Sequence, residues 1–204
     1  MLGYNKCMRT YLLGTSNKGK IIEIKECLAD LPIVLLTPDD LPYPPLPPHE
    51  EMDTFEENAI QKAQYYFDSS GIFSIADDSG ILVEALKNEL GIHTRRWGAG
   101  PMASDEEWIT YFLNRMKTES NKRARFTCVI ALIDESGEPQ IFHGHCDGII
   151  TESLEAAYLP GLPISACFKP DGFSKVFSAL SIEEKNRLSH RGKAVRELRM
   201  HLET

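Results

Sequence analysis

The sequence predicts an α/β protein, a two-lobed mixed β-sheet with flanking helices and a cleft between the lobes. Strand and helix patterns alternate over the first half of the chain, which favours parallel strands. A hairpin pattern in the second half favours antiparallel strands, so the sheet is expected to be mixed. A length of 204 residues suits one domain, and we treat residues 1–204 as a single unit.

The N-terminal part predicts a strand–helix unit followed by an extended connector. An apolar strand is expected at residues 8–14, with a turn at residues 15–19 after it. Ile21, Ile24, Leu28 and Leu31 recur at spacings of three and four, which predicts one buried helix face. Residues 41–48 hold five prolines, so we expect no regular element there.

Capping patterns mark the later helices, and a hairpin separates the last two of them. Residues 72–76 are expected to form a buried strand that ends at a turn beginning with Asp77 and Asp78. Residues 126–133 and 140–150 flank a polar turn and predict the hairpin, and the last helical region is expected to break at residues 189–192. The capping pairs are Thr54 with Glu57, Ser104 with Glu107, and Ser181 with Glu184.

Charge and composition exclude several classes of protein. Lys plus Arg number 22 against 30 Asp plus Glu, a net charge of −8, which argues against binding nucleic acid. No run of 18 apolar residues is present, so no contact with a membrane is expected. Five cysteines without a C-x-x-C pair, and no signal-peptide pattern, favour a reduced cytoplasmic protein without a zinc cage.

The first candidate site is the turn at residues 14–20, which reads Gly-Thr-Ser-Asn-Lys-Gly-Lys. Backbone N–H groups at a helix start, together with Lys20, suit a phosphate group. The string matches most of the P-loop pattern, but Ile21 replaces the hydroxyl residue that holds Mg²⁺ there. A P-loop ATPase or GTPase remains an alternative, as does an ordinary turn capped by Asn17.

The second candidate is the pair Asp77 and Asp78. Adjacent strand residues point to opposite sides, so one carboxylate is expected to face the sheet and the other the cleft. Two such charges raise a pKa unless a cation neutralises them, and Mg²⁺ prefers oxygen ligands. The alternative is a polar turn held by local hydrogen bonds.

The third candidate is Lys185 with residues 189–192, Ser-His-Arg-Gly, because Arg191 can pair with a phosphate or a base edge. A solvated helix face is the alternative. His143 and His145 share one strand face but lack a third ligand, and we interpret them as ordinary strand residues. An acidic cluster at residues 50–57 suits a helix start, with one carboxylate as a metal ligand the alternative.

Taken in order, these motifs resemble the inosine triphosphate pyrophosphatase family, the HAM1/RdgB-like non-standard purine nucleotide pyrophosphatases. The resemblance covers nearly the whole chain. The T-G-N-x-x-K turn is similar to residues 15–20 with Glu23, and the T-F-x-E-N-A-x-x-K-A helix to residues 54–63. The strings A-D-D-S-G-L, G-x-x-S-A-R-[YW] and K-x-x-x-S-H-R-G are similar to residues 76–81, 91–97 and 185–192.

The resemblance implies a Mg²⁺-dependent homodimer that hydrolyses a nucleoside triphosphate of inosine, deoxyinosine or xanthosine to the monophosphate and pyrophosphate. It implies that Asp78 activates the water, with Asp77 and Lys20 as further catalytic residues and Asp78 and Glu50 as metal ligands. The implied substrate-binding residues are Thr15, Ser16, Asn17, Lys18, Gly19, Lys20, Lys62, Ser79, Arg96, Leu162, Pro163, Ile164, Ser165, Lys185, His190 and Arg191.

One loop departs from the family pattern. Residues 161–166 read Gly-Leu-Pro-Ile-Ser-Ala where the family has G-F-G-Y-D-P, whose aromatic ring and Asp contact the purine. Aliphatic surface and Ser165 would have to take these roles here. A changed base specificity, or a nucleotide-binding protein that no longer catalyses, therefore remains open.

Overall fold

The computed structural model describes residues 8–49, 51–100 and 102–204, and a six-stranded mixed sheet lies at its centre. The strands, in the spatial order β2-β1-β3-β4-β5-β6, are β1 (Arg9–Leu13), β2 (Ile33–Leu36), β3 (Phe73–Val83), β4 (Arg123–Ile133), β5 (Gln140–Ile150) and β6 (Phe168–Pro170). The helices are α1 (Lys18–Leu28), α2 (Phe55–Ser70), α3 (Asp105–Met116), α4 (Ile182–Leu188) and α5 (His190–Leu202). Short 3₁₀ helices include η3 (Gly91–Arg96), η4 (Pro163–Ala166) and η5 (Phe177–Ala179).

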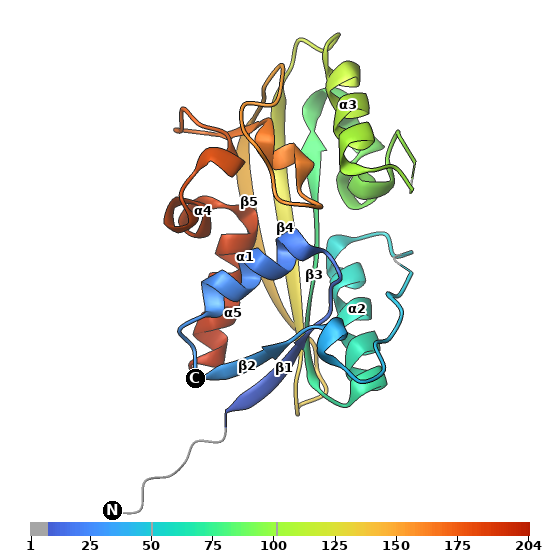
Figure 1. Ribbon diagram of the computed structural model, residues 1–204, viewed down its shortest axis with the longest axis vertical. Coiled ribbons are helices and arrows are strands. Elements are labelled where there is room, and N and C mark those ends of the chain that lie inside the picture. Colours follow the sequence, from blue (N-terminus) through green and yellow to red (C-terminus); the bar gives the residue numbers. More distant parts are fainter. Residues whose placement is uncertain (1–7, 50, 101) are drawn as a thin grey trace, which may run out of the picture.

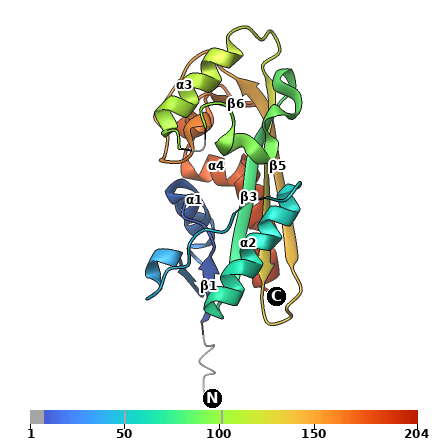
Figure 2. The same cartoon turned by 90° about the vertical axis from the view of Figure 1, so that its right-hand side faces the viewer.

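Parallel and antiparallel pairs meet at β3. β1 is parallel to both β2 and β3, whereas β3, β4, β5 and β6 pair antiparallel in turn. Helices α1 and α5 cover one face of the lower half of the sheet, and α2 covers the opposite face (Figures 1 and 2). Helix α3 lies at the other end of the long strands (Figure 1). The predicted mixed α/β sheet is therefore confirmed.

The unequal lengths of β1 and β3 create the place where a site can form. Strand β1 ends with Leu13 opposite Ile75, and the Gly14 N–H donates to the Ile75 carbonyl at 2.7 Å. Strand β3 continues to Val83, so within the described residues its edge beyond Ile75 has a strand on the β4 side alone. This edge separates a lower lobe, with α1, α2 and α5, from an upper lobe, with α3 and η4.

Separate apolar cores stabilise the two lobes. The core beneath α1 and α5 contains Ile24, Ile75 and Val195, and a smaller core beneath α2 is rich in alanine. The upper core gathers aromatic side chains around Trp108 and Phe112 of α3. Burial of apolar surface, at about 25 cal/mol per Å², makes each of these cores stabilising.

The structure corrects the expected turn at Asp77 and Asp78. Both residues lie in the middle of β3, opposite Ile130 and Val129 of β4, and the strand continues for five residues beyond them. Buried carboxylates are tolerated there because cationic side chains from α1, α2 and α5 approach them. Tertiary contacts thus outweigh the turn preference of a polar run.

The helix starts agree with the capping patterns, and two helix ends differ. Ser104 and Ser181 form capping boxes, and the Thr54 hydroxyl accepts the Glu57 N–H. Helix α1 ends at Leu28, so Leu31 lies outside it although its side chain packs on the same core. The last helical region breaks at Ser189 alone, and residues 190–192 form the first turn of α5.

Three further findings complete the comparison with the expected elements. The extended connector and the β4–β5 hairpin are confirmed, whereas the short strands β2 and β6 were not expected. The turn expected at residues 15–19 is shorter, because α1 already begins at Lys18. Among the described residues, none of the helices combines the length and the apolar character that crossing a membrane requires.

Candidate active site

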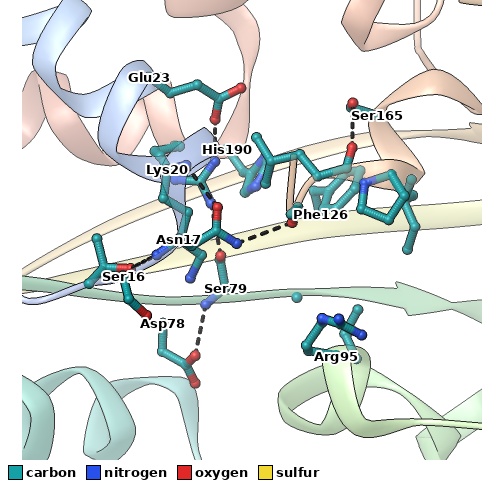
Figure 3. A pocket seen from close by; sticks show the side chains of 18 of the residues that line it. Ser16, Asn17, Lys20, Glu23, Asp78, Ser79, Arg95, Phe126, Ser165 and His190 are labelled. Atoms are coloured by element: carbon teal, nitrogen blue, oxygen red, sulfur yellow. Dashed lines mark hydrogen bonds and ion pairs between the residues drawn. The ribbon is translucent and has the colours of Figure 1, made fainter. Parts of the chain in front are cut away.

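A cavity of about 330 Å³ lies at the free edge of β3, between the two lobes (Figure 3). Its size falls within the range of small-molecule sites. Five cationic side chains and two carboxylates line it, so its charge is opposite in sign to that of the whole chain. These charged residues are Lys20, Lys62, Arg95, Lys185, Arg191, Glu23 and Asp78.

The turn after β1 forms the floor of the cavity. The Asn17 side chain caps α1 by accepting the Lys20 N–H at 3.1 Å, and Thr15 Oγ1 accepts the Asn17 N–H at 3.2 Å. Thr15, Ser16, Asn17 and Lys20 line the cavity, so the positive end of α1 faces it. Lys18 points to solvent and Gly19 is covered, and neither lines the cavity.

Asp77 and Asp78 face opposite sides of β3 and have different surroundings. The Asp77 side chain is completely buried, with Oδ2 3.0 Å from Lys20 Nζ and 3.5 Å from Arg191 Nη2. Asp78 lines the cavity, and its Oδ1 lies 3.3 Å from Lys62 Nζ. Asp78 is therefore the carboxylate that a substrate can reach, whereas Asp77 holds cations in place.

The charges around Asp77 determine its protonation. Burial alone would raise the pKa of Asp77, but the nearby Lys20 and Arg191 outweigh burial and hold its pKa far below the usual range. Asp77 is therefore ionised at neutral pH. The neutralising charge that the sequence assigned to Mg²⁺ is, for this carboxylate, supplied by protein cations.

Glu23 joins a second pair of cations at the same end of the cavity. Its Oε1 lies 2.6 Å from Lys185 Nζ, and its Oε2 accepts a short hydrogen bond from Arg191. Burial would raise the pKa of Glu23, but Arg191 and Lys185 lower it. Arg191 also donates to Ser79 Oγ at 2.9 Å. Glu23, Lys185 and Arg191 thus form one connected network under the cavity.

The opposite end of the cavity is apolar and aromatic. The His190 ring stacks on Phe126 at 4.5 Å between centroids and lies nearly parallel to Phe177 at 6.0 Å. Burial, assisted by Arg191, lowers the pKa of His190 well below its usual value, so the ring is neutral at pH 7. Its Nδ1 is buried without a hydrogen-bond partner. A flat base with polar edges would find apolar surface and a polar ring atom here.

The loop at residues 161–166, whose sequence differs from the family pattern, forms the upper wall of this apolar end. Leu162, Pro163, Ile164 and Ser165 all line the cavity. Ser165 Oγ donates to the Leu162 carbonyl at 2.6 Å, which leaves the lone pairs of this hydroxyl to accept a hydrogen bond. The Gly161 carbonyl accepts from Asn17 Nδ2 at 3.1 Å, so this loop contacts the turn at residues 14–20 directly (Figure 3).

The structure does not describe the side chains of two residues that the resemblance named, and several residues that line the cavity were not predicted. Glu50 lies outside the described residues, and Arg96 belongs to η3 with a side chain that is not described. Arg95 lines the cavity instead, at a position where the family string has Ala, so no motif could indicate it. Glu23 was in the resemblance as the Glu that follows the family's turn, but it was not assigned a role there. The other unexpected lining residues include Tyr66, Thr94, Trp108, Phe126 and Phe177.

The described side chains fit a magnesium ion that is shared with a phosphorylated substrate. Within the described residues, no group of three or more His, Cys, Asp or Glu side chains could form a metal cage, and His143 and His145 lie exposed on β5. Mg²⁺ at nucleotide sites takes one or two carboxylates and completes its shell with phosphates and water. Asp78 lines the cavity with one cationic side chain, Lys62, at its Oδ1, and it meets that requirement. Glu23 has a cationic partner at each oxygen, Lys185 and Arg191.

Known proteins resemble this chain over most of its length. The model of the Ham1 family matches residues 11–201. A dITP/XTP pyrophosphatase of Leptospira interrogans is 41% identical over 196 residues, 96% of this chain and 98% of that protein. The dITP/XTP pyrophosphatase of Thermus thermophilus is 38% identical, over 92% of this chain and 88% of that protein.

A solved structure shows the same fold. The HAM1 protein from Coxiella burnetii superposes with a TM-score of 0.80 at 32% identity, covering 96% of this chain and 98% of that chain. The family match spans most of the sequence, and the relatives exceed 30% identity over nearly their whole length. The chain therefore belongs to the Ham1 family.

Proposed function

We propose that this protein is a nucleoside triphosphate pyrophosphohydrolase acting on non-standard purine nucleotides. Its substrates are the triphosphates of inosine, deoxyinosine and xanthosine, and its products are the monophosphate and pyrophosphate. The observation that carries the proposal is one cavity with cations and Asp78 at one end and aromatic rings at the other. The relatives named dITP/XTP pyrophosphatases support the same substrate class.

The cationic end suits the polyphosphate. A triphosphate carries about four negative charges, which lysines and helix N–H groups offset in a site partly closed to water. Lys20 at the start of α1 and Lys62 on α2 approach the cavity from two sides. Their carboxylate partners on β3 fix where both ammonium groups lie, so the charge is in place before the substrate arrives.

We assign the activation of the attacking water to Asp78. It lines the cavity, and Lys62 Nζ and the Ser79 N–H both contact its Oδ1, which fixes the direction of the carboxylate. An oriented carboxylate can accept the proton of an attacking water as the bond between the α- and β-phosphates breaks. Asp78 and substrate phosphates would also hold Mg²⁺, which supplies positive charge against the charge that develops on the leaving pyrophosphate.

The direct test is incubation of the protein with inosine triphosphate and Mg²⁺, with pyrophosphate release as the readout. Asp78→Asn should lower kcat about 10²- to 10⁴-fold, the range for loss of a general base, in the fraction of the protein that circular dichroism shows to be folded. The matched control is Asp147→Asn on β5, because that exposed carboxylate pairs with Arg125 outside the cavity. Release of orthophosphate would show that the cleaved bond is misassigned, and tight binding without turnover would indicate a binding protein.

The remaining expectations are proposals with their own measurements. Mg²⁺ dependence follows if a chelator abolishes turnover and added Mg²⁺ restores it. The homodimer stays a prediction, which analytical sedimentation can test. The arrangement of both lobes in one domain also stays a prediction, which limited proteolysis can test. The cysteines of the described chain are free, which supports the proposed cytoplasmic location, where thiols stay reduced.

A further inference from the structure

The backbone N–H and carbonyl of Gly161 are hydrogen-bonded to opposite lobes. Its N–H donates to Asp105 Oδ2 at 2.6 Å, and its carbonyl accepts from Asn17 Nδ2 at 3.1 Å. Asp105 is the first residue of α3 in the upper lobe, whereas Asn17 caps α1 in the lower lobe. The loop at residues 161–166, which forms the upper wall of the apolar end, therefore begins at a fixed point between the lobes.

The geometry around Gly161 leaves little room for another arrangement. Its φ of +81° lies in the left-handed region, and a Cβ there would come within 2.6 Å of Asn17 Nδ2. The next residue, Leu162, packs on the first turn of α1, where a Cβ on Gly19 would come within 2.7 Å of Leu162 Cγ. The loop thus rests directly on the turn that faces the phosphate end.

Asp105 is itself held in position. Its Oδ1 lies 3.9 Å from Arg95 Nη2, and Arg95 also donates to the Ala103 carbonyl at 2.7 Å. These contacts hold Oδ1 toward Arg95 and leave Oδ2 to accept the Gly161 N–H. Asp105 does not line the cavity, so it reaches a bound substrate through Gly161 and through Arg95, which lines the cavity.

We propose that Asp105 is a positioning residue that fixes the loop at residues 161–166, which would contact the base, at a set distance from the turn at residues 14–20, which would contact the phosphates. This inference rests on the proposed function and deepens it, because it concerns how one site holds both ends of a nucleoside triphosphate. A hydrogen bond to a carboxylate is stronger than one between neutral groups. Losing it frees residues 161–166 but leaves Lys20 and Lys62 in place, and Arg95 keeps its hydrogen bond to the Ala103 carbonyl. Binding of the base therefore weakens while binding of bare polyphosphate does not.

The test compares Asp105→Ala and Asp105→Asn with the wild-type protein. Asp105→Ala should raise KM for inosine triphosphate about tenfold, as expected for one hydrogen bond to a charged group, with kcat within twofold. Inhibition by inorganic tripolyphosphate, which has no base, should stay within twofold. Asp105→Asn keeps an oxygen that can accept the Gly161 N–H and should restore most of the affinity.

The matched control is Glu106→Ala, which removes an exposed acidic residue from the same first turn of α3. It changes the helix-dipole interaction equally but leaves the Gly161 N–H bonded, so it should behave as wild type. An unchanged KM in Asp105→Ala, or a parallel loss of tripolyphosphate inhibition, would overturn the inference. An Asp105→Asn variant as impaired as Asp105→Ala would also overturn it.

Hydrogen exchange at the Gly161 amide decides the inference without any turnover. The amide should exchange at least tenfold faster in Asp105→Ala than in the wild-type protein or in Glu106→Ala, and equal rates would refute the contact. If the wild-type protein hydrolyses no triphosphate, the proposed function fails, yet this exchange measurement still reports on Asp105. The two failures are therefore distinguishable.

Discussion

Replacing Asp77 by Asn should destabilise the fold far more than its size suggests. The carboxylate is completely buried and lies 3.0 Å from Lys20 Nζ and 3.5 Å from Arg191 Nη2. Asn keeps the shape but removes the charge, so the buried Arg191 loses one of its two carboxylate partners. Removing one partner of a buried ion pair costs about 3–5 kcal/mol, because the remaining charge stays desolvated.

Urea unfolding at pH 7 measures this loss. With a slope of about 3 kcal/mol per M, the midpoint of Asp77→Asn should fall by about 1 to 1.7 M. The control is Asp147→Asn, whose bidentate pair with Arg125 is solvent-exposed and worth about 0–1 kcal/mol. If the urea midpoint of Asp77→Asn falls no further than that of Asp147→Asn, the reasoning that the buried charges at β3 stabilise one another is refuted.

The pH dependence of the same variant gives an independent check. The folded-state pKa of Asp77 is held far below its unfolded value of about 3.9, so its contribution is complete above about pH 4. That contribution is lost as the pH falls below 4, because the unfolded state then binds the proton. The difference between wild type and Asp77→Asn should therefore be constant from pH 5 to 7 and narrow toward pH 3.

Two further predictions concern the apolar end. Burial lowers the pKa of His190 well below 6.5, so its contribution to stability is complete above pH 6.5 and is lost on acidification. Between pH 7.5 and 5.5, the free energy of unfolding of the wild type should therefore fall by about 1 kcal/mol more than that of His190→Asn, as measured by urea titration. Parallel pH curves for the two proteins would contradict this. Gly19→Ala places a Cβ within 2.7 Å of Leu162 Cγ and 2.9 Å of the Pro160 carbonyl. It should cost about 1–3 kcal/mol and raise KM for inosine triphosphate, and an unchanged midpoint and KM would show that the loop yields freely.

Local patterns predicted the helices better than the strands. A capping box is a short-range signal, since the Ser104 side chain and Glu107 satisfy each other's backbone within one turn. A strand such as β2, four residues long and half-buried, carries no comparable signal and forms because β1 lies beside it. The continuation of β3 through Asp77 has the same origin, because its partners in β4 lie about 50 residues away.

The residues of the candidate site also differ in how well local patterns predict them. Lys20, Lys62, Asp78 and residues 185–191 belong to motifs that the sequence displays, and the structure gathers their lining members at one cavity. Arg95 and the ring of Phe126 belong to no motif and reach the cavity through the packing of η3 and β4. Sequence reasoning therefore identifies groups that perform chemistry more readily than the surfaces that surround the base.

The two adjacent aspartates show why a motif does not by itself assign a role. A strand sends neighbouring side chains to opposite faces, so Asp77 enters the packed interior and Asp78 enters the cavity. Asp77 then needs cations at neutral pH, and the cations that it attracts, Lys20 and Arg191, are ones that also line the cavity. The charge of Asp77 therefore affects the substrate only by fixing the positions of the Lys20 and Arg191 side chains. Loss of Asp77 should displace two cations together, whereas loss of Asp78 should remove turnover and weaken one buried ion pair, that with Lys62.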